Sequence, residues 1–250
     1  MAADFRFNWL EGFSLVLGIV FHRLFKGIVV DTEGLREIRQ AARDAPIVLV
    51  PAHRSHIDYL MLSVVFYMHG LIPPHIASGE NLSFWPMGLI FRRSGAFFIR
   101  RSTKGNELYA AVLRHYVRKL VKDGYWVEFF IEGTRSRSGK CLNPKYGMLS
   151  MIVDAVASGG APDAYLVPCA ITYEKVIEER SYTSESGGSE KKKENFAGLA
   201  ASAKVLGSRY GKVYVQFEHP VSLKSILASE GVPVPVPAGD AVPRETLSRL

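Results

Sequence analysis

Residues 47–68 read IVLVPAHRSHIDYLMLSVVFYM, and this stretch decides the fold class. Its first part, residues 47–52, is apolar and rich in β-branched side chains, which is typical of a strand buried on both faces of a sheet. Residues 57–68 form a longer apolar run of helical length. A buried strand that leads directly into a helix indicates an α/β layered domain.

The same alternation continues along the chain. Short β-rich runs recur at residues 75–78, 96–99, 126–131, 166–173 and 213–217. Helix-like segments lie at residues 86–91, 106–122, 145–156 and 194–208. We therefore expect a single layered α/β domain, with a mostly parallel or mixed central sheet flanked by helices. In such folds, functional residues usually lie at the carboxyl ends of strands.

The two ends of the chain differ from this pattern. Residues 1–34 have an aromatic start, a short apolar centre and a basic end at Arg23 and Lys26, which indicates an N-terminal amphipathic helix. Such a helix would lie in a membrane interface or pack on the domain's own core. Residues 229–250 contain a Val-Pro alternation and predict an extended linker and tail. Residues 35–228 remain as the central domain.

Composition narrows the classes of partner. The 250 residues include 31 Lys and Arg against 24 Asp and Glu, a net charge of +7, which favours an anionic partner: nucleic acid, a phospholipid surface or a phosphorylated small substrate. Two cysteines exclude a disulfide scaffold and a Cys-rich zinc module. Neither Gly-x-Gly-x-x-Gly nor Gly-x4-Gly-Lys-Ser/Thr is present, so a nucleotide-binding loop is unsupported. The chain also lacks the aromatic-basic interleaving of RNA-binding modules.

His53 and Asp58 follow the first strand, five positions apart. A histidine fixed through one ring nitrogen by a carboxylate presents the other nitrogen as a general base. The sequence has no Gly-x-Ser-x-Gly nucleophile motif, so the base would activate a hydroxyl of the substrate itself. The alternative is structural, because Ser55-x-x-Asp58 also fits a capping box at the start of a helix.

Arginines follow two further strands. They are Arg100, Arg101, Arg135 and Arg137. Forked donors that converge on one crevice would hold a phosphate, whereas the simpler interpretation is a solvated basic rim that touches lipid headgroups. Glu132 would orient an arginine, and the turn at residues 133–136 would contribute backbone amides.

Four blocks, taken in order, resemble the glycerol-3-phosphate acyltransferase and dihydroxyacetone-phosphate acyltransferase family. They are Pro51 to Asp58, Gly95 to Arg101, Glu132 to Lys140 and Val167 to Glu174. Residues 193–199 and 220–224 also look like the bacterial glycerol-phosphate enzymes, so that the resemblance spans about residues 35–227. It is far more specific than any one block, and it favours the catalytic interpretation of His53.

The resemblance implies transfer of a fatty acyl group from acyl-CoA or acyl carrier protein to the sn-1 hydroxyl of glycerol 3-phosphate. The product would be lysophosphatidic acid, in the first step of phospholipid synthesis. His53 would be the general base, Asp58 would orient it, and no covalent acyl-enzyme, metal or cofactor would be needed. The expected partners are glycerol 3-phosphate, the acyl thioester donor, which includes acyl carrier protein, and the cytoplasmic face of a phospholipid membrane, with no nucleic acid.

The same resemblance assigns the pocket. Substrate-binding positions are Arg54, Arg100, Arg101, Glu132, Gly133, Arg135, Ser136 and Arg137. Residues that border the acyl and substrate sites, or hold the blocks in place, are Phe98, Ile99 and Pro168. Dihydroxyacetone phosphate and lysophosphatidate are the alternative acceptors. A basic module that binds anionic lipid without catalysis is the alternative outside enzymes.

Overall fold

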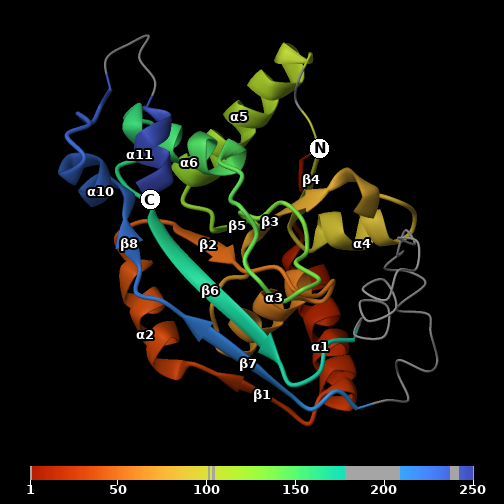
Figure 1. The fold of residues 1–250 in the computed structure, drawn as a ribbon. Helices are drawn as coiled ribbons and strands as arrows, with labels where there is room; N and C mark the ends of the chain where they lie inside the picture. The colour runs from red at the N-terminus through yellow and green to blue at the C-terminus, as the bar shows by residue number, and fades with distance from the viewer. Residues whose placement is uncertain (1, 101, 103–104, 178–208, 237–241, 250) are drawn as a thin grey trace.

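The structure is a computed structural model that describes residues 2–100, 102, 105–177, 209–236 and 242–249 (Figure 1). Three sequence predictions lie outside these residues. They are the phosphate-binding role of Arg101, the helix at 194–208 and the motif at 193–199.

One eight-stranded sheet forms the centre of the molecule. Its strands are β1 (Gly27–Val30), β2 (Ile47–Pro51), β3 (His75–Gly79), β4 (Ala96–Ile99), β5 (Val127–Glu128), β6 (Tyr165–Tyr173), β7 (Lys212–Phe217) and β8 (Val221–Ser222). The order is β1-β7-β6-β2-β5-β3-β4, with β8 paired to β6. Strands β6, β2, β5, β3 and β4 are parallel neighbours, whereas β7 and β8 pair with β6 in the antiparallel sense. The predicted mostly parallel or mixed α/β sheet is confirmed.

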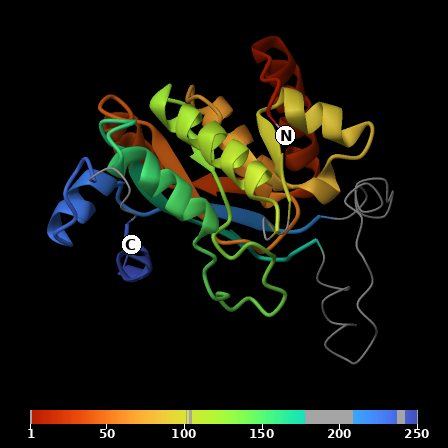
Figure 2. The same ribbon diagram turned by 90° about the horizontal axis from the view of Figure 1, so that it is seen from above.

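Helices cover both faces of this sheet (Figures 1 and 2). They are α1 (Phe7–Leu24), α2 (Thr32–Ala41), α3 (Asp58–Met68), η1 (Glu80–Leu82), α4 (Met87–Arg93), α5 (Glu107–Lys122), α6 (Gly147–Ala157), α10 (Leu223–Ser229) and α11 (Arg244–Arg249). Side chains alternate between the two faces along a strand, so that Leu49 packs with α1–α4 and Val48 packs with α5, α6, α10 and α11.

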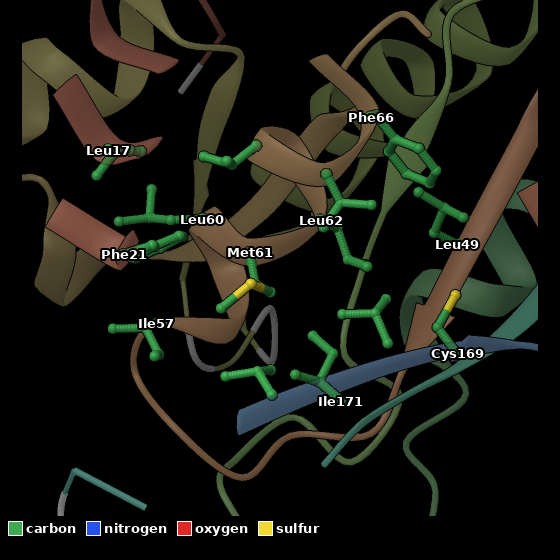
Figure 3. Packing of buried hydrophobic residues seen from close by; sticks show 14 of the residues in the cluster. Leu17, Phe21, Leu49, Ile57, Leu60, Met61, Leu62, Phe66, Cys169 and Ile171 are labelled. Carbon is green, nitrogen blue, oxygen red and sulfur yellow. The ribbon is translucent and has the colours of Figure 1, made fainter. Parts of the chain in front are cut away.

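Helix α3 is apolar almost all round because it lies between the sheet and α1. Leu60, Met61 and Leu62 are buried, and they meet Leu17 and Phe21 of α1 in one cluster (Figure 3). Tight packing on several sides fixes the first turn of α3, which carries Asp58. The core thus holds rigid the element on which the site is built.

The N-terminal segment, predicted as one helical unit over residues 1–34, divides into two elements. Helix α1 ends at Leu24, and β1 joins the sheet as a parallel partner of β7. The inner face of α1 is buried in the core, whereas Leu15, Val16 and Ile19 are exposed on its outer face. No helix in the described part of the chain is long and apolar enough to cross a membrane.

Two predicted ranges differ from the observed ones. The strand expected over 126–131 is paired only at Val127 and Glu128, because the chain then leaves the sheet and Ser136 N donates to the carbonyl of His53 (2.9 Å). The expected linker packs on the domain instead. Val236 N donates to the carbonyl of Ala157 (2.7 Å), and Leu247 of α11 is buried in the core beside α6.

Candidate functional site

The site lies at the carboxyl end of β2, in the turn that leads to α3. His53 is in this turn and exposes 3% of its side chain, and Asp58, at the start of α3, is fully buried. His53 Nδ1 lies 3.0 Å from Asp58 Oδ2. The structure therefore brings into direct contact the two residues that spacing predicted to act together.

Asp58 is held by several donors. Oδ2 also accepts hydrogen bonds from the backbone nitrogens of Arg54 (2.7 Å) and Ser55 (2.8 Å). Oδ1 accepts one from the hydroxyl of Tyr173 (2.5 Å). The carboxylate thus points back into the turn and accepts from Ser55 N, as the acidic residue of a capping box does, while Asp58 N donates to the carbonyl of Ser55 (3.2 Å). Asp58 therefore has a structural role at the start of α3 in addition to its contact with His53. These bonds fix the carboxylate in one orientation against His53.

The second ring nitrogen of His53 faces a tyrosine. His53 Nε2 lies 3.0 Å from the hydroxyl oxygen of Tyr59. Phe130 packs on the imidazole with ring centroids 4.0 Å apart, and Tyr59 meets both rings edge-on at 4.9 Å. With the Nδ1 proton assigned to the bond with Asp58, Nε2 is the acceptor nitrogen.

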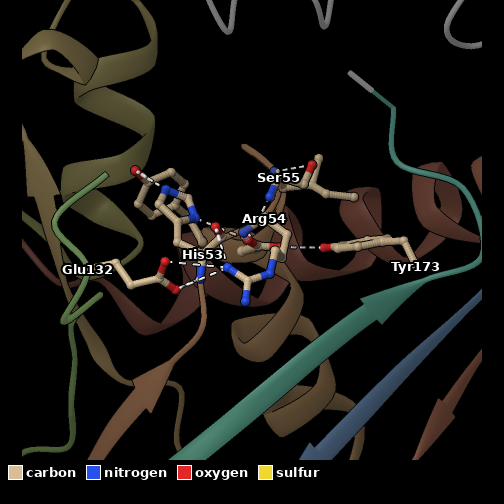
Figure 4. Close-up of polar contacts among 8 residues, drawn as sticks. His53, Arg54, Ser55, Glu132 and Tyr173 are labelled. Atoms are coloured by element: carbon tan, nitrogen blue, oxygen red, sulfur yellow. Dashed lines mark hydrogen bonds and ion pairs between the residues drawn. The ribbon is translucent and has the colours of Figure 1, made fainter. Parts of the chain in front are cut away.

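Glu132 fastens the loop after β5 to the turn after β2 (Figure 4). Its Oε1 accepts hydrogen bonds from His53 N (3.2 Å) and from the guanidinium of Arg54 (3.2 Å), and its Oε2 accepts one from Leu142 N (3.0 Å). The arginine that Glu132 contacts is thus Arg54. Ser136 closes the same loop, because its hydroxyl donates to the carbonyl of Lys140 (2.5 Å).

The predicted arginines lie in different surroundings. Arg54, Arg135 and Arg137 are partly buried, on the turn and on the loop that Glu132 joins. Arg135 lies near enough to Tyr59 for its charge to act on that phenol. Arg100 is exposed, with its guanidinium 4.9 Å above the ring of Tyr109 and 4.0 Å from the carboxylate of Glu80. The structure brings the first three to the turn and the loop, and it directs Arg100 toward α5.

The remaining predicted residues shape the strands and the loop. Gly133 has φ +64°, and a Cβ there would come within 2.8 Å of the side chain of Lys145. Phe98 is buried in β4, and Ile99 is half-buried at the end of that strand. Pro168 pairs with Val50 across β6 and β2, and its own side chain is exposed.

An apolar cavity lies beside the histidine, between α1, α3, α4, β3 and β4. Its lining is Leu10, Phe13, Ser14, Leu17, His56, Tyr59, Leu60, Ser63, Ile76, Ser78, Leu82, Phe91, Ser94 and Ala96. Tyr59 connects the cavity with the His53–Asp58 dyad, because it belongs to the cavity lining and its hydroxyl contacts His53. The cavity therefore reaches the residue that contacts the imidazole.

Sequence reasoning missed three residues around the dyad. Tyr59 directly follows Asp58, and Tyr173 belongs to the fourth motif, but neither residue type nor spacing separates them from core tyrosines. Glu128 in β5 is fully buried, and neither carboxylate oxygen has a hydrogen-bond partner among the described residues. Burial raises its pKa well above the usual range, and the charge of Asp58 adds to that effect.

Within the described ranges, no three His, Cys, Asp or Glu side chains gather closely enough to hold a metal ion. The independence of the reaction from metals and cofactors stays a prediction. The contacts described above suit a general base, because Asp58 orients the imidazole and the other ring nitrogen faces the Tyr59 hydroxyl.

Comparisons with known proteins give two family matches and a similar solved structure. The model of the acyltransferase family matches residues 29–172, and the model of the glycerol-3-phosphate acyltransferase C-terminal region matches residues 182–248. Among solved structures, the 1-acyl-sn-glycerophosphate (LPA) acyltransferase PlsC from Thermotoga maritima is similar, with a TM-score of 0.51 and 18% identity. The match covers 89% of this chain and 67% of that one. At this identity, the likeness concerns the fold alone.

Proposed function

This chain belongs to the acyltransferase family, and we propose that it transfers a fatty acyl group from a thioester to the sn-1 hydroxyl of glycerol 3-phosphate. The observation that carries the proposal is the His53–Asp58 dyad, whose acceptor nitrogen lies beside an apolar cavity. The match to a glycerol-3-phosphate acyltransferase C-terminal region supports this acceptor. Lysophosphatidate and dihydroxyacetone phosphate are the alternatives.

The mechanism begins at Nε2 of His53. This nitrogen takes the proton of the acceptor hydroxyl, and the oxygen attacks the thioester carbonyl carbon. The tetrahedral intermediate then expels the thiolate, which receives the proton from the imidazolium, so that an ester and a free thiol are the products. Asp58 orients the imidazole and stabilises its protonated form. Transfer is proposed to be direct, without an acyl-enzyme, as the family resemblance implies.

The two substrates would approach from different sides. We assign the acyl chain to the side of the site where the apolar cavity lies, because its lining includes Tyr59, whose hydroxyl contacts His53. Arg54 contacts the carbonyl of His53, Arg135 lies near Tyr59, and Arg137 follows on the same loop, so these cations suit the acceptor phosphate. We extend this role to Arg100 and Arg101, as the family motif implies.

A first experiment tests the reaction. Purified protein is incubated with labelled glycerol 3-phosphate and a long-chain acyl-CoA or acyl carrier protein, beside His53→Ala and, as control, His115→Ala on the exposed face of α5. We expect lysophosphatidic acid from wild type and the control and none above background from His53→Ala. Undiminished activity in His53→Ala contradicts the mechanism, and turnover only with lysophosphatidate or dihydroxyacetone phosphate contradicts the acceptor.

A second experiment tests the phosphate clamp. Arg101→Ala should raise the KM for glycerol 3-phosphate by more than it changes kcat, because a residue that binds the unreacting phosphate contributes equally to the ground and transition states. Steady-state kinetics with the acceptor varied checks this expectation. A fall in kcat with unchanged KM contradicts the assignment.

We also propose that α1 contacts a phospholipid surface. Leu15, Val16 and Ile19 are 65%, 56% and 64% exposed on the outer face of the helix, and His22 and Arg23 lie in its last turn. Exposed apolar residues beside cations suit the boundary between acyl chains and anionic headgroups. Deletion up to Val30 is a poor test, because it also removes β1 and buried side chains of α1.

Substitution separates the two faces of α1. The triple variant Leu15→Gln, Val16→Gln, Ile19→Gln should lose flotation with anionic liposomes while its unfolding curve stays that of wild type. Leu108→Gln with Val112→Gln is the matched control, because these α5 residues are also exposed (78% and 48%). Flotation equal to wild type in the triple variant contradicts the membrane proposal.

A further inference from the structure

Tyr59 holds a position that the acceptor hydroxyl must take. It lies one residue after Asp58, in the first turn of α3, and its hydroxyl oxygen is 3.0 Å from His53 Nε2. Its ring is fixed edge-on against the rings of His53 and Phe130, each at 4.9 Å. The lone pair that receives the substrate proton is therefore occupied by this contact in the structure.

The phenol is a hydrogen-bond donor in this contact. Burial raises the pKa of Tyr59 above its ordinary value, and the nearby charge of Asp58 acts in the same direction, against that of Arg135. The hydroxyl consequently keeps its proton. Because Nδ1 of His53 gives its proton to the bond with Asp58, Nε2 accepts and Tyr59 donates.

Tyr59 also faces the cavity that would hold the acyl chain. Its neighbours in the lining include Leu60 and Ser63, which follow it on α3. A thioester whose chain occupies this cavity has its carbonyl close to both the imidazole and the phenol. When the acceptor hydroxyl replaces Tyr59 at Nε2, the phenol needs only a small movement to turn its O–H to the carbonyl oxygen.

We propose that Tyr59 is a catalytic residue that caps His53 in the free enzyme and donates a hydrogen bond to the oxyanion during transfer. This inference rests on the proposed function. As the acceptor oxygen bonds to the carbonyl carbon, its proton passes to Nε2 and the π electron pair moves to the carbonyl oxygen, where the Tyr59 hydroxyl stabilises the negative charge. Collapse returns that pair to the carbonyl, breaks the carbon–sulfur bond and passes the imidazolium proton to the thiolate.

Tyr59→Phe is the test, because it keeps the ring against His53 and Phe130 and removes only the hydroxyl. Loss of one oxyanion donor lowers kcat by about 10²- to 10³-fold, and we expect KM for both substrates to stay within about threefold. Tyr116→Phe is the matched control, since its hydroxyl accepts a hydrogen bond from Ala3 N (3.1 Å) and its ring packs on Phe97 in the core with α5. Its kcat should equal that of wild type.

A second measurement tests whether Tyr59 covers His53 Nε2, and it does not depend on turnover. Diethyl pyrocarbonate acylates unprotonated imidazole nitrogen, and mass spectrometry of the peptide gives the rate at His53. We expect this rate to rise several-fold in Tyr59→Phe. If acylation of His53 is faster in Tyr59→Phe but kcat is unchanged, Tyr59 only covers His53 and the oxyanion role is wrong. If His53 is acylated at the same rate in Tyr59→Phe and wild type, Tyr59 does not cover His53.

The design separates this inference from the proposed function. Thioester consumption is measured with each of the three acceptors. If glycerol 3-phosphate alone gives no turnover, the proposed acceptor is wrong. The kcat values of Tyr59→Phe and wild type can still be compared with another acceptor. A kcat of Tyr59→Phe within about twofold of wild type, with whichever acceptor turns over, overturns the role of Tyr59.

Discussion

At the scale of single residues, Asp58 connects three parts of the chain. Its carboxylate contacts the ring of His53 and accepts hydrogen bonds from two backbone amides of the turn after β2. It also accepts a hydrogen bond from the hydroxyl of Tyr173 in β6. Each bond points at the carboxylate from a different direction, so that its orientation is determined several times over. A change of this one side chain therefore alters the imidazole and the turn together.

Asp58→Asn should leave the fold close to native and remove most of the activity. The amide group presents a donor where the carboxylate accepts, so His53 is held in the wrong tautomer. An equivalent change in a serine protease triad lowers kcat by about 10⁴-fold, and we expect a loss of this order with little change in KM. Steady-state thiol release measures it, with Tyr173→Phe as a milder comparison that removes one hydrogen bond to Oδ1. A loss of tenfold or less, which corresponds to at most about 1.4 kcal/mol, would contradict the role of Asp58.

Glu128 predicts a dependence of stability on pH. Because burial raises its pKa, the folded protein keeps a proton that the unfolded chain releases above about pH 4.3. Unfolding then releases a proton, and the free energy of unfolding falls as pH rises above that value. Glu128→Gln has no proton to release at this position. Its free energy of unfolding should therefore rise relative to that of wild type as pH increases from about 5 to about 8.

Urea unfolding at several pH values measures this difference. Glu218→Gln, at an exposed position after β7, is the control and should follow the wild-type curve. Curves for Glu128→Gln and wild type that stay parallel across the range would show that Glu128 does not keep its proton.

The sequence predicts part of this site for a clear reason. His53 and Asp58 are close in sequence, so that spacing alone suggests their contact, and the motifs identify Glu132. The contact between Tyr173 and Asp58 joins residues 115 positions apart, and only the order of strands in the sheet creates it. Tyr59 is next to Asp58, but its role depends on a side-chain direction that sequence does not contain.

At the scale of elements, α1 has two faces with different tasks. Phe21 is 1% exposed and packs against Phe25, whereas Ile19, two residues earlier, is 64% exposed. Phe21→Ala should lower the free energy of unfolding by about 3–5 kcal/mol. Ile19→Ala should change it by no more than about 0.5 kcal/mol. Urea unfolding compares them, and similar values for both would mean that α1 does not dock on the core in solution.

The outcome for α1 also shows what sequence patterns miss. Its apolar run is compatible with a core and with a membrane interface, because both demand the same residue types on a helix. The structure shows that the inner face of α1 packs against α3 in the core. β1 escaped prediction since its short run follows this helix closely and its partner β7 lies far along the chain.

At the scale of the whole molecule, the C-terminal segment belongs to the core rather than to a linker. Leu247 is 6% exposed, and Arg249 forms an ion pair with Glu230 (2.8 Å). Leu247→Ala should therefore lower the free energy of unfolding by about 2 kcal/mol or more. Thermal or urea unfolding checks the value, and wild-type stability would restore the interpretation of this segment as a free tail. Composition favoured a linker because Val-Pro repeats adopt an extended conformation whether they are free or packed on a surface. Composition alone therefore does not distinguish the two cases.

The pairing of β1 with β7 has a consequence for the order in which the protein is made. Gly27 of β1 lies opposite Lys212 of β7, so the ribosome has to synthesise most of the chain before the edge of the sheet is complete. The strands β2 to β5 and the dyad beside them can form earlier, since β2 to β5 pair only with strands that end before Glu174, whereas β6 still lacks β7 and β8. Non-local pairing of this kind slows folding and leaves apolar strands exposed meanwhile. A nascent chain stalled before β7 would therefore hold an assembled His53–Asp58 turn while its first strand still waits for a partner.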